Sequence, residues 1–175
     1  MTALRRAFWF WGLAVALAGC APTLDWREVR VGAAESVSLF PCKPSAHARE
    51  VSLGQQRVKL TLHACQAGGA TWGLAWADVT DPAQVAPALR ALLESARANL
   101  GEARVQARPF NAKGQTPHPA AGRWALQGRY PDGQAVSGHV AVFSRGTVVF
   151  QATVLGVADP SEPADTFLAG LRFGS

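Results

Sequence analysis

The sequence predicts an α+β fold, in which a mostly antiparallel sheet has a central and a C-terminal helix packed on it. Segments of alternating apolar and polar residues, which are typical of half-buried strands, occur both before and after the middle of the chain. Between them, apolar residues recur every three or four positions, as they do on one face of a helix. Runs of strands that are interrupted by single helices favour an antiparallel sheet covered by helices.

The first half of the chain is predicted to form strands at 26–31, 36–41, 51–53, 58–63 and 71–79. The segment 58–63 alternates most regularly, so Val58, Leu60 and Leu62 are expected to face inward. Gly54 places a turn before this strand.

A central helix is predicted over about residues 83–100. Thr80 or Asp81 can cap its start, and Pro82 suits the first helical position. Gly101 is expected to end it. The apolar stripe that would pack on the sheet consists of Val85, Leu89, Leu92, Leu93, Ala96 and Leu100.

The second half of the chain is predicted to form strands at 104–108, 123–130, 135–144 and 147–155, the last three as an antiparallel meander. A final helix is expected after Asp159, with Phe167 and Leu171 docked on the sheet and Phe173 at its end. Residues 109–122 are rich in Pro, Gly and polar residues and show no periodicity, so they are predicted to form a long loop.

The first 20 residues have the organisation of an export segment. Arg5 and Arg6 precede an uncharged apolar run over residues 7–18. This run is shorter than the roughly 20 residues that a helix needs to cross the bilayer core. It ends in Leu-Ala-Gly-Cys at residues 17–20, which resembles a lipobox, the processing site of bacterial lipoproteins. An uncleaved membrane anchor is the alternative interpretation.

By this resemblance, the sulfur of Cys20 would carry a diacylglycerol, and its amine, freed by cleavage, would also be acylated. Two or more acyl chains anchor a protein stably in a membrane. The resemblance implies a lipoprotein signal peptide at 1–19, a lipidated cysteine with a short tether at 20–30, and a single α+β domain at 31–175. Ala21, in place of an aspartate, resembles the pattern of lipoproteins sent to the outer membrane, which implies an envelope protein facing the periplasm.

The charge of the chain argues against a nucleic-acid partner. The sequence has 17 basic and 12 acidic residues, so a mature chain without Arg5 and Arg6 would carry a net charge of +3. These charges are scattered, as on an ordinary soluble domain, and form no basic stripe. We therefore expect no nucleic-acid binding.

Two cysteines remain besides Cys20, and an even number of thiols in an oxidising compartment favours a disulfide. We predict that Cys42 and Cys65 are joined, which would contribute roughly 3 kcal/mol in the chain-entropy model. A redox or metal pair is the alternative. The two cysteines are far apart in the sequence, however, and no spacing adds the further ligands that zinc would need beside His63 and Cys65. No metal or other cofactor is therefore expected.

The predicted strand 71–79 places Trp72, Leu74 and Trp76 on one face and small residues on the other. Two tryptophans in one row can form a stacking platform for a ligand, so Trp72 and Trp76 are the candidate ligand-binding residues. The alternative, which we favour, is that this face belongs to the core or is covered by a helix.

At residues 37–44, Val-Ser-Leu-Phe-Pro-Cys-Lys-Pro, the chain resembles the opening strand of PsbP-like domains. The central helix, the strand that ends in Tyr130 and the closing helix with Phe167 are also similar, so the resemblance covers most of residues 36–173. It implies an α+β sandwich and an accessory or assembly role. The pair Cys42 and Cys65 departs from the usual domain and is more similar to uncharacterised bacterial envelope lipoproteins.

No catalytic residues are assigned. The histidines at 47, 63, 118 and 139 lie in no motif, and the sequence has no nucleophile elbow, zinc-protease motif or phosphate loop. We therefore expect a non-enzymatic interaction or assembly module that binds an envelope protein, through an exposed sheet face or the loop 109–122. The alternative is a small-ligand-binding lipoprotein with a pocket between helix and sheet, for which Trp72 and Trp76 are the pointers.

Overall fold

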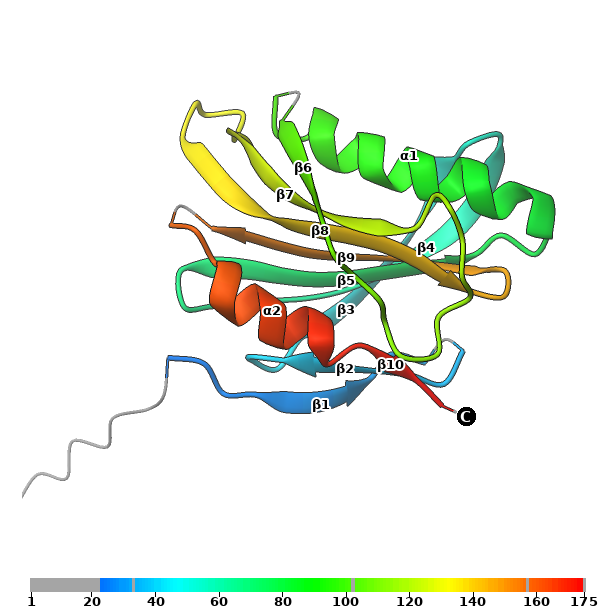
Figure 1. The fold of residues 1–175 in the computed structure, drawn as a ribbon, viewed down its shortest axis with the longest axis horizontal. Helices are drawn as coiled ribbons and strands as arrows, with labels where there is room; N and C mark the ends of the chain where they lie inside the picture. The colour runs from blue at the N-terminus through cyan, green and yellow to red at the C-terminus, as the bar shows by residue number, and fades with distance from the viewer. Residues whose placement is uncertain (1–22, 33, 102, 157, 175) are drawn as a thin grey trace, which may run out of the picture.

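The computed structural model describes residues 23–32, 34–101, 103–156 and 158–174. The predicted signal peptide and Cys20 lie outside these residues. In the described part, the chain forms two antiparallel sheets and two α-helices, so the predicted α+β class is confirmed. The larger sheet lies in the middle, with α1 on one face and with α2 and the smaller sheet on the other (Figure 1).

The larger sheet has the strand order β3-β4-β5-β9-β8-β7-β6 among the described residues, and its neighbouring strands are antiparallel. The predicted meander is present as β7, β8 and β9. Because β9 also pairs with β5, the two halves of the chain form one continuous sheet. The strands are β3 (Ser45–Leu53), β4 (Gln56–Ala67), β5 (Ala70–Asp78), β6 (Arg104–Arg108), β7 (Gly122–Arg129), β8 (Ala135–Arg145) and β9 (Val148–Gly156).

The smaller sheet has the order β1-β2-β10 and consists of β1 (Arg27–Arg30), β2 (Ser36–Phe40) and β10 (Arg172–Phe173). β1 begins within the stretch predicted as a tether, so the folded part of the chain includes residues before 31. β10 occupies residues expected at the end of the final helix. That helix ends at Ala169, before the residues that pair with β2, and Gly170 packs so closely on β2 that an added Cβ would lie only 2.4 Å from the Leu39 Cβ.

β3 is longer than the predicted strand 51–53. Its first six residues are exposed, and the strand pairs only with β4 in the described structure. An edge strand with two solvated faces needs no apolar alternation, and the sequence pattern therefore gave no sign of its first six residues.

The two helices close two separate cores. α1 (Val85–Ala98) follows a short 3-10 turn, η1 (Pro82–Gln84). The Asp81 carboxylate caps the start of η1 by accepting a hydrogen bond from the Ala83 N–H at 2.9 Å. Its buried residues pack on one face of the larger sheet. On the other face, α2 (Ser161–Ala169) buries Phe167 against Phe40 and Trp72, with ring centroids 5.2 and 5.6 Å apart. Both cores consist of described residues, so we expect a protein of residues 23–175 to fold without the predicted export segment.

The predicted disulfide between Cys42 and Cys65 is confirmed. Cys42 follows β2 of the smaller sheet, and Cys65 lies in β4 of the larger one, with 6.1 Å between their Cα atoms. The bond therefore joins the two sheets covalently on the face that α2 covers.

The predicted loop at 109–122 packs along the sheets. The Thr116 N–H donates to the Ser144 carbonyl at 2.7 Å, and the Phe173 N–H donates to the Lys113 carbonyl at 3.0 Å. The Phe110 ring lies 5.4 Å from the ring of Phe143. These contacts attach the loop to both β8 and β10, and the loop helps to close the core beneath α2.

Candidate functional site

A groove of about 680 Å³ opens between α1 and the face of the larger sheet formed by β3, β4 and β5. This volume lies within the range of roughly 300–1,000 Å³ that is typical of small-molecule sites. Gly73 and Ala75 of β5 form its floor. Leu60 and Leu62 of β4 form one wall, and the side of α1 around Leu92 forms the other. The lining is therefore mostly aliphatic.

The position of α1 creates the groove. At its start, α1 lies close to the β3–β4 turn, where an added Cβ on Gly54 would be 3.2 Å from the Pro87 Cβ. From there the helix runs across to β9 and β8, and the Gln151 side-chain amide donates to the Leu92 carbonyl at 3.4 Å (Figure 1). Because α1 crosses the strands obliquely, it leaves much of the β4–β5 surface uncovered.

The strand register explains why no large side chain rises from the floor of the groove. Gly73 pairs with Ala64 and with Thr153, and Ala75 pairs with Leu62. Two small residues thus occupy successive positions on one face of a central strand. An added Cβ at Gly73 would have the Leu62 Cδ1 at 3.4 Å as its nearest neighbour, followed by two carbonyl oxygens at 3.9 and 4.0 Å. The space above the floor is therefore open.

The three β4 residues predicted to face inward do share one face, but they differ in burial. Val58 is 7% exposed and packs beneath the start of α1, whereas Leu62 is 39% exposed. The prediction was wrong for Leu62, because α1 has already turned away from β4 at that point. Alternation identified the face of the strand, and only the path of the helix determined how far that face is covered.

Trp72 and Trp76, the candidate ligand contacts, lie on the opposite face of β5 from the groove. Trp72 is 1% exposed, its ring contacts Trp26 and Phe167 edge-on, and its Nε1–H donates to the Ala67 carbonyl at 3.0 Å. A ligand that stacked on Trp72 would have to displace core side chains. Trp76 is partly buried at the margin of the same core. The sequence signal for the groove was instead the row of small residues that alternates with the tryptophans.

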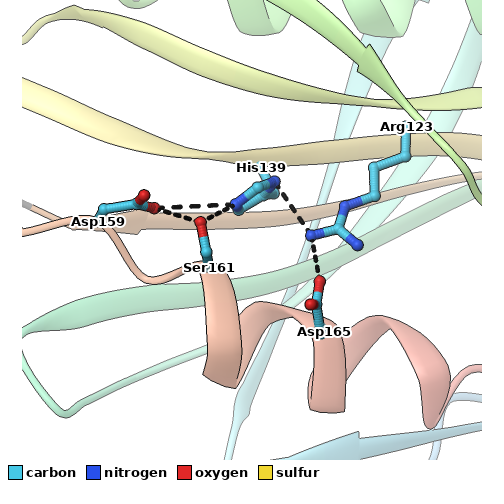
Figure 2. Close-up of polar contacts among 5 residues, drawn as sticks. All are labelled: Arg123, His139, Asp159, Ser161 and Asp165. Atoms are coloured by element: carbon cyan, nitrogen blue, oxygen red, sulfur yellow. Dashed lines mark hydrogen bonds and ion pairs between the residues drawn. The ribbon is translucent and has the colours of Figure 1, made fainter.

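A second group of side chains gathers where β7 and β8 meet α2 (Figure 2). His139, 4% exposed, has its Nε2 atom 3.2 Å from the Ser161 Oγ, which donates to the Asp159 carboxylate at 2.6 Å. On its other side, the His139 Nδ1 lies 3.1 Å from the Arg123 guanidinium, which pairs with Asp165 at 2.6 Å. We call these five residues the polar cluster. Sequence reasoning missed it, because the members come from segments far apart in the chain.

The orientation of His139 determines what the polar cluster can do. The Arg123 guanidinium can only donate, so the His139 Nδ1 accepts and the proton of the neutral ring lies on Nε2. Nε2–H then points toward Ser161 and cannot take a proton from it. In a catalytic triad a carboxylate faces the equivalent nitrogen and prepares the ring as a base, whereas here a cation does. This arrangement is that of a structural contact between the sheet and α2.

Burial lowers the pKa of His139 below its usual value, and the Arg123 guanidinium acts in the same direction. The unfolded chain, with a histidine pKa near 6.5, therefore binds a proton that the folded state resists. We expect the free energy of unfolding to fall as the pH drops below about 6.5, and the fall to be smaller in a His139→Gln variant. Urea denaturation at pH 7.5 and pH 5.5 measures both.

Part of the acid sensitivity should persist in that variant, because burial also lowers the pKa of His63. His47→Gln, at an exposed position on β3, is the matched control and is expected to retain the wild-type pH dependence. An equal loss of stability in wild type and His139→Gln on acidification would contradict the assignment.

Within the described ranges, no three His, Cys, Asp or Glu side chains are grouped so that they could hold a metal ion. No helix in that part of the chain is both long and apolar enough to cross a membrane. No protein-family model matches this sequence, and no curated protein matches it. The described part of the chain is thus a two-sheet α+β domain with an open apolar groove between α1 and the larger sheet.

Proposed function

We propose that the protein is a lipid-anchored envelope lipoprotein whose domain binds an elongated apolar ligand in the groove between α1 and β3–β5. The observation that carries this proposal is the groove itself, with its aliphatic walls around the small residues Gly73 and Ala75. Apolar concave sites of this volume are the usual form of small-ligand sites. In the polar cluster, by contrast, His139 directs its Nε2–H toward Ser161 and therefore does not act as a base for the serine.

The start of the domain supports the link between anchor and groove. Leu24 lies against the β4–β5 turn, where an added Cβ on Gly68 would be 2.8 Å from the Leu24 side chain. Ala64 and Thr71, which line the groove, lie near the same turn. From Cys20 to Leu24 the chain reaches at most about 14 Å. A lipid on Cys20 would therefore hold this end of the groove near the bilayer.

Filling the groove is expected to abolish ligand binding without unfolding the domain. In Gly73→Leu, the new side chain enters open space beside the flexible Leu62 side chain. We expect the uncharged fluorophore N-phenyl-1-naphthylamine to bind residues 23–175 saturably, and the variant to lose at least tenfold in affinity through steric exclusion. Fluorescence titration measures binding, and thermal melting verifies the fold.

Ala46→Leu is the matched control, since Ala46 is exposed on β3 and does not line the groove. It adds a similar apolar side chain elsewhere and should leave the affinity for the fluorophore unchanged. Equal binding by wild type and a folded Gly73→Leu variant, or no binding by wild type, would rule out a ligand groove.

A second candidate function is the interaction or assembly module that the sequence predicted. All five residues of β6 are exposed at the edge of the larger sheet, including Val105 at 37%. The unpaired backbone groups of an edge strand can accept a strand from a partner. Photocrosslinking from position 105 in the native envelope tests this candidate, since a protein that binds only a groove ligand would give no crosslinked partner there.

A further inference from the structure

The described lining of the groove carries basic but no acidic side chains. Among its described lining residues there is no Asp or Glu, while Arg49 and His47 stand on the rim formed by β3. Glu50, which follows Arg49 on β3, does not line the groove. Polar but uncharged groups, Ser95 and Asn99 of α1, line the opposite rim. The groove therefore combines an aliphatic floor with a rim on which the Arg49 guanidinium is the one charged group among the described lining residues.

Arg49 has no partner among the described residues: its guanidinium makes neither an ion pair nor a hydrogen bond there. On α1, Glu94 pairs with Arg97 at 3.1 Å and does not line the groove. No carboxylate of the groove lining neutralises the guanidinium. A planar guanidinium that is free to turn toward the groove is well suited to a carboxylate, which it can bind through two parallel hydrogen bonds.

The floor also limits the width of the ligand. At Ala75 the floor is flanked by two larger side chains, Leu62 on β4 and Gln151 on β9. Neighbouring strands are about 4.8 Å apart, so at Ala75 the trough accommodates one extended hydrocarbon chain and not two side by side.

We infer that the groove binds a single-chain fatty acid, with its carboxylate at Arg49 and its hydrocarbon chain along the trough above Gly73 and Ala75. This inference rests on the proposed function, because it assigns the ligand of the same groove. The ligand is a free carboxylic acid, because a diacyl phospholipid would need room for a second hydrocarbon chain.

The test compares ligands that share one chain and differ in the head. Dodecanoate and dodecanol, kept below the concentrations at which they aggregate, compete with N-phenyl-1-naphthylamine for residues 23–175. We expect wild type to bind dodecanoate roughly fivefold more tightly than dodecanol, as one exposed charge-assisted contact would give. In Arg49→Gln the two affinities should become equal, through loss of dodecanoate affinity alone. Arg57→Gln, an exposed change at the start of β4 that does not line the groove, should keep the preference.

The outcomes separate the two proposals. Equal affinities in wild type, or a preference that survives Arg49→Gln, would overturn the fatty-acid inference while leaving an apolar groove in place. Displacement of the fluorophore by phospholipid vesicles but not by dodecanoate would also overturn it. If the fluorophore itself fails to bind wild type, the proposed function is what fails.

Discussion

Replacing both Cys42 and Cys65 with alanine is expected to lower the free energy of unfolding by roughly 3 kcal/mol, or the melting temperature by about 6–12 °C. The bond closes a loop of 23 residues in sequence separation and connects the end of β2 with β4. Without it, the unfolded chain gains conformational freedom, and the smaller sheet loses its disulfide link to β4 of the larger one. Urea and thermal denaturation of the two proteins measure the difference.

Reduction supplies the matched control for this prediction. Wild type in a reducing buffer should lose about as much stability as the double variant, whereas the double variant should be insensitive to the reductant. A melting temperature of wild type that does not respond to reductant, together with free thiols by mass spectrometry, would contradict the bond. Because cytosolic thiols are kept reduced, the same experiment in cells reports whether the domain is exported.

Replacing Cys20 with serine is expected to abolish incorporation of labelled palmitate into the protein. A serine oxygen is not the acceptor in a lipobox, and the other two cysteines are joined to each other. Each buried CH₂ of an acyl chain contributes about 0.8 kcal/mol to membrane affinity, so loss of the chains removes essentially all anchoring of the domain. Labelling followed by immunoprecipitation, with the mass of the mature protein, measures the modification.

The variant with Cys42 and Cys65 replaced by alanine is also the control for this experiment, since it changes two cysteines but leaves Cys20 in place. It should incorporate palmitate as wild type does. Continued labelling of Cys20→Ser, or an unlabelled wild type that retains residues 1–19, would contradict the lipoprotein proposal. If the groove still binds its ligand in that case, ligand binding is a property of the domain that does not depend on a lipid anchor.

Elements with a strong local pattern were predictable from the sequence. The apolar stripe from Val85 to Ala96 and the capping Asp81 predicted α1, and the β-prone segments after residue 122 predicted the meander β7-β8-β9. Two cysteines besides Cys20, in a chain whose predicted export segment implies an oxidising compartment, predicted the disulfide. In each case the deciding signal is a repeat or a count, which needs no knowledge of distant contacts.

The exposed strand β3, the short strand β10 and the polar cluster were not predictable in the same way. The first six residues of β3 carry no apolar alternation because both their faces meet solvent, and β10 depends on pairing with β2, far away in the sequence. His139 and Ser161 meet only because α2 crosses the sheet at β8. Contacts between distant segments bring these residues together, and the sequence of each segment alone contains no pattern that predicts those contacts.

By itself, the sequence determined the α+β class, the central helix, the disulfide and the alternation of β5, in which tryptophans on one face oppose Gly73 and Ala75 on the other. Only the tertiary structure decided which of those faces is open. α2 and the smaller sheet bury Trp72, while α1 crosses obliquely and leaves the small residues beneath a groove. The physical reason is that alternation fixes the two faces of a strand, whereas the packing of distant elements fixes how much of each face is covered.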